Sequence, residues 1–156
     1  MQIEQIAADA ATESRAAFTA DPKAFEAAAA FLAKRVMERR NSIPILSHIR
    51  IEATPAGAVI LSGTDLDQLA RVTIAADVES PGTVCVEAGP LADALAKLAK
   101  GKAGHIRFAS EGQEAHFPAR TIERVILTAG TGGAAFTLKT LPADDFPLTP
   151  ISEAGE

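Results

Sequence analysis

The sequence predicts an α+β fold: two βαβββ units with two helices on one face of an antiparallel sheet. Two observations predict it. Two segments repeat their apolar residues with the period of a helix, whereas the other patterned segments alternate with the period of a strand. The order β-α-β-β-β then occurs twice along the chain, so each half contributes one helix. A length of 156 residues fits one such domain.

In the first half, a short strand from Ala16 to Ala20 leads into a helix from Pro22 to about Arg39. Asp21 is a typical N-cap, and proline is favoured at the first helical position. The helix ends before the Asn41-Ser42-Ile43-Pro44 segment. Its apolar face is spaced at helical intervals and contains Phe25, Ala29, Leu32 and Val36.

The chain after this helix changes to a period of two, which predicts strands separated by short turns. Turns are expected at Pro55-Ala56-Gly57 and Pro81-Gly82, and a break at Gly63-Thr64-Asp65. The predicted strands are Leu46–Ala53, Ala58–Ser62, Gln68–Val78 and Thr83–Glu87.

In the second half, Pro90 opens a helix that ends at Gly101, with Leu91, Leu95 and Leu98 on one face. A turn is expected at Glu111-Gly112, and the glycine-rich segment 130–133 reads as a hairpin loop. The predicted strands are His105–Ala109, Arg124–Ala129 and Ala134–Leu141.

Three regions follow from this pattern. Residues 1–17 are expected to be an N-terminal extension, helical or disordered, and 18–147 a single domain. Residues 148–156 form a C-terminal tail. The N-terminal residues are acidic and alanine-rich, without the basic and apolar stretches of a signal peptide, and no apolar run is long enough to span a membrane. A cytoplasmic protein is therefore expected.

Composition excludes several kinds of site. Without Trp or Tyr, a base-stacking platform is not expected. The single Cys85 excludes a disulfide framework and paired-cysteine zinc sites, and the three histidines lie far apart. We find no nucleophile–base pair, so we expect no catalytic residue, no metal, no cofactor and no enzymatic activity.

Positive charge gathers on the predicted helices although the formal net charge of the chain is −5. Such an asymmetry suits helices that face phosphates, since lysine and arginine there make contacts independent of base sequence. The alternative is a solvated face whose cations stabilise helix C-termini. From Lys23 to Arg50 the basic residues are Lys23, Lys34, Arg35, Arg39, Arg40 and Arg50, against Glu26 and Glu38; Lys97, Lys100 and Lys102 accompany the second helix, against Asp93.

Other candidate residues carry weaker signals. Asp65 and Asp67 could serve acid–base or metal chemistry, but Asp-x-Asp after a strand favours turn capping. His48 and His105 fall in strand patterns and are expected to be packed or at a sheet edge. His116 has no evident partner ligand, and Cys85 alternates with valines as a buried thiol does.

Four segments in order resemble a known family. They are Asn41–His48 (NSIPILSH), Asp65-Leu66-Asp67, Pro81-Gly82-Thr83 and Phe136–Pro147 (FTLKTLPADDFP). The series resembles the first domain of the bacterial DNA polymerase III beta subunit, the sliding clamp. The resemblance covers roughly Phe18 to Pro147 and implies a clamp-like domain of two βαβββ units with both helices on one face.

The resemblance also implies a function. Family chains have three such domains, and two chains form a ring around duplex DNA whose helices touch the phosphate backbone. Arg40 matches a DNA-contacting arginine of the family. The same role is expected for the other helix cations, which are Arg39, Lys34, Arg35, Lys23, Lys97 and Lys100.

The implied partners are duplex DNA, further clamp-like chains or copies of this chain, and components of DNA polymerase III or its clamp loader. The family's peptide pocket for the last group lies on later domains. Three departures stand out: one domain only, the N-terminal extension, and an insertion at Gln113–Glu123 where the family has a tight hairpin. The alternative is an interaction or oligomerisation module that keeps the fold without binding DNA and uses these added segments.

Overall fold

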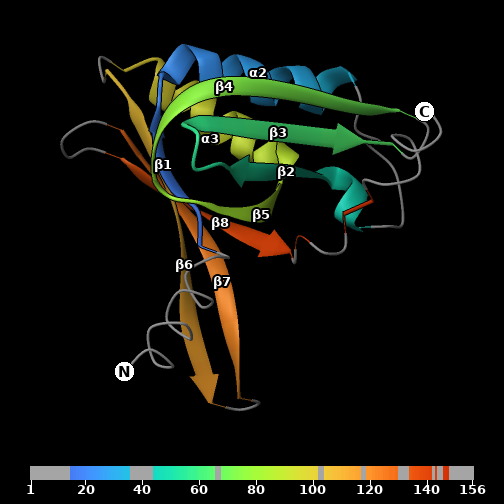
Figure 1. Ribbon diagram of the computed structural model, residues 1–156, viewed down its shortest axis with the longest axis vertical. Coiled ribbons are helices and arrows are strands. Elements are labelled where there is room, and N and C mark those ends of the chain that lie inside the picture. The colour runs from blue at the N-terminus through green and yellow to red at the C-terminus, as the bar shows by residue number, and fades with distance from the viewer. Residues whose placement is uncertain are drawn as a thin grey trace.

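The computed structural model describes residues 15–35, 44–65, 68–101, 104–116, 119–129, 134–141, 143 and 146–147. Within these ranges two α-helices and eight strands follow the predicted order (Figure 1). The elements are β1 Ala17–Ala20, α2 Pro22–Arg35, the 3-10 helix η1 Pro44–Ser47, β2 His48–Ala53, β3 Ala58–Thr64, β4 Leu69–Ser80, β5 Gly82–Glu87, α3 Ala88–Ala99, β6 Ile106–His116, β7 Ala119–Ala129 and β8 Ala135–Leu141.

The sheet is antiparallel, as predicted, but it closes on itself. Its strand order is β1-β4-β3-β2-β5-β8-β7-β6, and β1 pairs with both β4 and β6. The sequence predicts the antiparallel pairing but not this closure. Helix α2 packs against β2, β3 and β4, helix α3 packs against β5, β7 and β8, and the two helices pack against each other. The helices thus lie side by side on the concave side of the sheet.

Helix α2 begins where the sequence predicts. The backbone N–H of Ala24 donates to Oδ2 of Asp21 at 3.0 Å, which satisfies one of the free donors of the first turn. The described part of the helix ends at Arg35, so the predicted residues up to Arg39 lie outside it. Helix α3 begins at Ala88, two residues before the predicted Pro90, and the N–H of Gly101 donates to the carbonyl of Leu98 beyond its end.

Three boundaries in the first half differ from the prediction by two residues: the start of β2, the end of β3 and the end of β4, which reaches Ser80. Leu46 and Ser47 belong to η1, so the following strand begins at His48. Strand β3 continues through Gly63 and Thr64, which pair with Ala70 and Leu69, so the predicted break is wrong. The turn before β3 is as predicted. Its glycine, Gly57, has a φ of 84°, a conformation that strongly favours glycine.

Strands β6 and β7 form a hairpin much longer than predicted. Glu111 and Gly112 do not form a turn; they pair with Arg124 and Glu123 inside the hairpin. Pairing continues in one register from Ile106 opposite Ala129 to His116 opposite Ala119. The predicted insertion is therefore a continuation of both strands, which projects from the barrel (Figure 1). The predicted loop at 130–133 lies outside the described residues.

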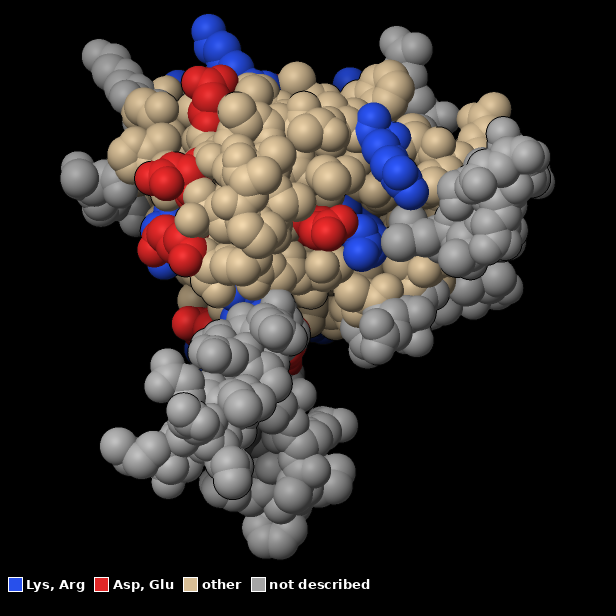
Figure 2. Space-filling view, viewed as in Figure 1, with Lys and Arg blue, Asp and Glu red and all other residues tan. Residues whose placement is uncertain are grey.

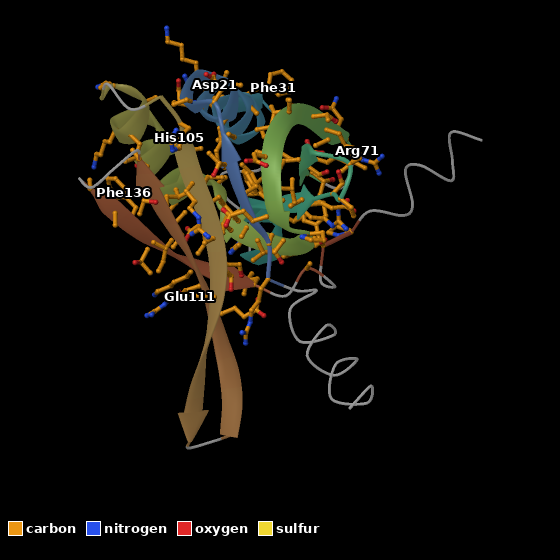
Figure 3. The ribbon with its side chains drawn as sticks, turned by 60° about the vertical axis from the view of Figure 1, so that its left-hand side comes forward. Asp21, Phe31, Arg71, His105, Glu111 and Phe136 are labelled. Atoms are coloured by element: carbon orange, nitrogen blue, oxygen red, sulfur yellow. The ribbon has the colours of Figure 1, made fainter. Side chains whose placement is uncertain are left out.

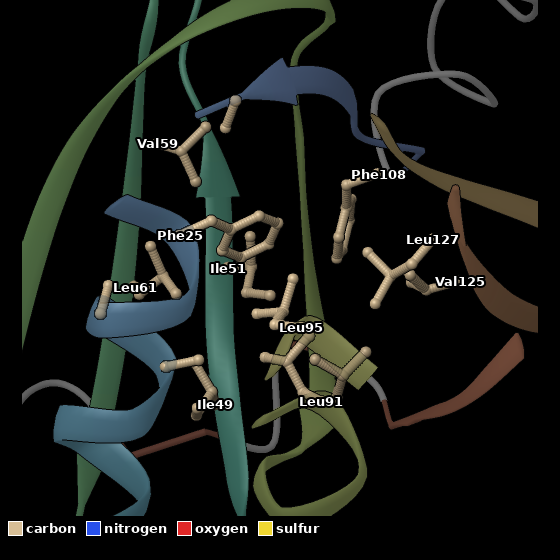
Figure 4. Packing of buried hydrophobic residues seen from close by; sticks show 14 of the residues in the cluster. Phe25, Ile49, Ile51, Val59, Leu61, Leu91, Leu95, Phe108, Val125 and Leu127 are labelled. Carbon is tan, nitrogen blue, oxygen red and sulfur yellow. The ribbon is translucent and has the colours of Figure 1, made fainter. Parts of the chain in front are cut away.

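The main core lies between the helices and the inner face of the sheet (Figure 4). Three phenylalanines meet there: Phe18 of β1, Phe25 of α2 and Phe108 of β6, all fully buried. The rings of Phe18 and Phe108 stack with centroids 4.8 Å apart, and Phe25 tilts against Phe18 at 5.5 Å. The predicted helix faces are the buried ones, including Leu32 of α2 and Leu95 of α3.

Replacement of Asp21 by alanine tests the N-cap. Asp21→Ala removes the acceptor for Ala24 N–H, so we expect a loss of about 1 kcal/mol in the free energy of unfolding, measured by urea denaturation. Asp21→Asn keeps a side-chain oxygen and should remain close to wild type. Equal losses in the two variants would contradict the capping role.

An ion pair across β1 gives a second prediction. Arg107 donates to Glu79 at 2.9 and 3.2 Å, and this hydrogen bonding holds the pKa of Glu79 below its usual range. A lowered folded-state pKa adds stability above the unfolded pKa, and that stability is lost as the pH falls through the folded value. We expect Glu79→Gln to flatten the pH dependence of the melting temperature on the acid side of pH 5. Because both side chains are about half exposed, the effect at neutral pH should stay below about 1 kcal/mol.

Candidate nucleic-acid interface

The outer face of the helix pair carries exposed lysines. Lys23 and Lys34 lie at the two ends of α2, and Lys97 and Lys100 lie at the C-terminal end of α3. Each helix buries its apolar stripe, so these lysines are left on the solvent side. The described carboxylates of the two helices are Glu26, which is half-buried, and Asp93, which is exposed. Within the bounds of α2 and α3 the charged residues are Lys23, Lys34, Arg35 and Lys97 against Glu26 and Asp93. At the helix ends, Lys100 follows α3, and Asp21 and Glu87 precede the two helices.

Three predicted DNA-binding residues are not placed by the structure. Arg39 and Arg40 lie outside the described residues, and only the backbone of Arg35 is described. The expectation for Arg40 therefore stays a prediction. Arg35 ends the described part of α2, so the segment that carries Arg39 and Arg40 continues from the same end of the helix as Lys34.

Arg50 does not belong to this helix layer. It lies in β2, where its Nη1 donates to Glu52 Oε1 at 3.0 Å and the side chain is 17% exposed. Arg50 is therefore removed from the basic residues of the helix face. Only its position in the sequence, close to the first helix, had grouped it with them. Its charge is already balanced by the carboxylate two residues along the strand.

Two features of the helix face were not anticipated. Phe31, in the exposed stripe of α2 between Lys23 and Lys34, is 42% exposed (Figure 3). The ammonium of Lys97 lies 5.9 Å from the centroid of the Phe136 ring of β8, within cation–π range. On the face shown in Figure 2, acidic and basic side chains are interspersed and form no continuous basic patch.

Two of the four segments that carry the family resemblance, Asn41–His48 and Phe136–Pro147, contribute to a second, smaller core. Val84 and Val86 face the main core, so Cys85 between them faces the other side of β5. There it packs with Ile45 and Leu46 of η1 and with Phe146, all buried. The buried thiol is as predicted. These motif residues hold η1 and the end of the domain against the sheet.

Asp65 has the predicted structural role. Its Oδ1 accepts from the backbone N–H of Gln68 at 2.8 Å, and Thr64 Oγ1 donates to the Gln68 carbonyl at 2.7 Å. These bonds close the turn between β3 and β4. Asp67 lies outside the described residues.

The histidines do not assemble a site. His48 is buried, with its Nδ1 3.4 Å from Ser47 Oγ, whereas His105 is exposed just before β6, not within a strand. The side chain of His116 is not described. In the described ranges no three His, Cys, Asp or Glu side chains are grouped so that they could hold a metal ion. No helix in these ranges has the length and apolar character needed to cross a membrane.

Residues 27–150 match the model of the N-terminal domain of the DNA polymerase III beta subunit. The chain belongs to this family. It is 33% identical over 113 residues to the beta sliding clamp of Caulobacter vibrioides and 32% identical to that of Pseudomonas aeruginosa, in each case over 72% of this chain and 27% of the relative. The chain thus spans about a quarter of the length of the curated relatives it matches.

Solved structures agree with the assignment. A crystal structure of the C. crescentus beta sliding clamp matches 88% of this chain and 33% of that one, with a TM-score of 0.74 and 30% identity. The sliding clamp from Bacillus subtilis matches with a TM-score of 0.71 at 23% identity, which shows the shared fold. The sliding clamps are a non-catalytic family of processivity factors, in line with the absence of an enzymatic motif from the sequence.

Truncation of Phe146 tests the structural role of the motifs. Phe146→Ala leaves a cavity beside Leu46 and Cys85, so we expect a loss of about 3–5 kcal/mol in the free energy of unfolding. Phe146→Leu keeps most of the volume and should cost less than about 1.5 kcal/mol. Denaturant titration of both variants gives the comparison, and a near-neutral alanine variant would contradict the packing role.

Proposed function

We propose that this chain is a clamp-type DNA-tethering module that contacts the backbone of duplex DNA, independent of sequence, through the outer face of α2 and α3. Family membership supports the clamp role. The observation that carries the DNA contact is the set of exposed lysines Lys23, Lys34, Lys97 and Lys100 on two helices that pack side by side.

The proposed mechanism is electrostatic and topological. Lysines on a rigid helix pair release counterions from the phosphates without reading bases, so the module holds DNA and still moves along it. The acidic balance of the whole chain limits attraction elsewhere on the surface. Arg35, Arg39 and Arg40 follow Lys34 in the sequence, and we expect them to add to this contact.

A ring around a duplex needs more than one such domain. We propose that other clamp domains, from copies of this chain or from a longer clamp, complete it. Polymerase or clamp-loader components then reach the assembly through those other domains. The alternative function, a protein-interaction module that has kept the fold, is favoured by one observation, the projecting β6–β7 hairpin.

Salt-dependent duplex binding tests the DNA contact. We expect the variant Lys23→Glu/Lys34→Glu/Lys97→Glu/Lys100→Glu to lose binding to a fluorescent duplex at low salt. Each phosphate contact removed should reduce the slope of log K against log salt by about 0.9. Two duplexes of unrelated sequence should behave alike.

The control variant reverses the charge of a lysine that lies outside the helix face. Lys139 is exposed on β8, away from the helices, so Lys139→Glu should leave the affinity close to wild type. Equal losses for Lys139→Glu and for Lys34→Glu alone would show that only net charge matters and would overturn the assignment of the helix face.

A further inference from the structure

Three adjacent strands place a row of polar side chains on the outer side of the sheet, away from the main core. Ser62 of β3 pairs with Arg50 of β2 on one side and with Arg71 of β4 on the other. Paired residues point to the same face of a sheet, and the chain neighbours Leu61 and Ile51 are buried in the main core. The three polar side chains therefore stand together on the outer face, with the short serine between two arginines.

Two polar atoms of this row are buried without a hydrogen-bond partner in the described part of the chain. They are Oγ of Ser62, a residue with 0% exposure, and Nε of Arg50. Buried hydroxyl and guanidinium groups are nearly always hydrogen-bonded, because an unmade bond in the interior costs free energy. Two such atoms on residues that pair across neighbouring strands indicate a position at which a ligand would complete the hydrogen bonding.

The ion pair of Arg50 determines which of its donors can take part. Its Nη1 donates to Glu52 Oε1 at 3.0 Å, which uses one side of the planar guanidinium group. The opposite edge consists of Nε–H and an N–H of Nη2, two parallel donors that match the two oxygens of a carboxylate. Since Nε has no partner, this edge can bind a second carboxylate while Glu52 holds the side chain in place.

Arg71 supplies the positive charge that a bound anion needs. It is exposed (Figure 3) and forms none of the ion pairs among the described residues. Two strand spacings, about 10 Å, separate its Cα atom from that of Arg50, so two long arginine side chains can close over one ligand. Together with Glu52, the two arginines leave one net positive charge, which a singly charged carboxylate balances.

We propose that Arg50, Ser62 and Arg71 form a carboxylate-binding site on the outer face of β2, β3 and β4. The carboxylate accepts hydrogen bonds from Nε and Nη2 of Arg50 and from the Ser62 hydroxyl, and Arg71 covers it from the solvent side. The exposed Arg71 side chain moves aside to admit the ligand. A small carboxylic acid and an acidic side chain of a protein partner both present this group, and the experiments below distinguish them.

This site does not depend on the proposed DNA contact, so the two proposals can fail separately. Helices α2 and α3 cover the main core, on the opposite side of the sheet from this row. We therefore expect Arg71→Gln to keep the duplex affinity of the wild type. The helix variants that lose duplex binding should still bind the carboxylate.

NMR spectra of the arginine side-chain N–H groups test the site directly. We expect sodium acetate, exchanged for sodium chloride at constant ionic strength, to shift the Arg50 Nε–H signal until it saturates; Arg50→Lys identifies that signal by its loss. Arg107 is the reference in the same spectrum, because its Nε already donates to Glu79 at 2.9 Å. Equal shifts of the two arginine signals, or no saturable shift of Arg50, would overturn the proposal.

A peptide probe identifies the source of the carboxylate. The probe is acetyl-Gly-Glu-Gly-amide, whose single carboxylate stands on a side chain. Binding of this peptide at least as tight as that of acetate assigns an acidic side chain of a partner, whereas a response to acetate alone restricts the site to small acids. The glutamine version of the peptide should leave the Arg50 signal unchanged. A saturable shift with the glutamine peptide would contradict recognition of a carboxylate.

Substitutions separate the roles of the charge and the hydroxyl. Arg71→Gln should lower the acetate affinity by about tenfold or more, and Arg107→Gln is the matched control because it removes the same charge elsewhere on the sheet. Ser62→Ala should also weaken acetate binding, while the melting temperature without acetate stays the same or rises, since a buried hydroxyl without a partner is removed. Equal losses for the two arginine variants, or an unchanged acetate affinity of Ser62→Ala, would contradict the site.

Discussion

The stack of Phe18 on Phe108 joins the two halves of the chain, and the rest of the structure depends on it. Strand β1 has only four residues, yet it pairs with β4 on one side and β6 on the other. Its buried ring lies between Phe108 of the second half and Phe25 of the first helix. A shift of β1 by one residue would turn this ring to the solvent. The register of β1 therefore also sets where α2 begins and how it lies on the sheet.

Local signals in the sequence were sufficient to predict the features that depend only on neighbouring residues. The Asp21 cap and the apolar period of α2 depend on neighbouring residues, and both were predicted. Closure of the sheet could not be predicted, because the pairing of β1 with β6 joins residues some 90 positions apart that share no local pattern. Gly63 and Gly112 were misjudged for another reason. Glycine is a turn signal, but the pairing of Gly63 with Ala70 in the β3–β4 ladder, and of Gly112 with Glu123 in the long hairpin, overrode that preference.

The candidate site was predictable to a similar degree. Helical spacing predicted that Lys34 and Lys97 would lie on the solvent side, because the buried stripe of each helix leaves them no other position. Arg50 was grouped with the helix cations only because of its position in the sequence, although the strand predicted over Leu46–Ala53 already places Arg50 and Glu52 on one face. No feature of the sequence predicted the exposure of Phe31, because an aromatic residue in an alanine-rich helix fits either face.

The motifs and the proposed DNA contact lie on different parts of the fold. Leu46 and Phe146 pack against Cys85 on the side of β5 opposite the main core, whereas the lysines stand outside the helices that cover that core. A motif match of this kind therefore indicates that the side chains needed for this packing are present. It places little constraint on the helix face, where an exposed lysine contributes little to stability and its replacement leaves the core intact. Fold and DNA contact can consequently diverge independently within such a family, and only measurements on the helix face decide whether a given chain has kept both.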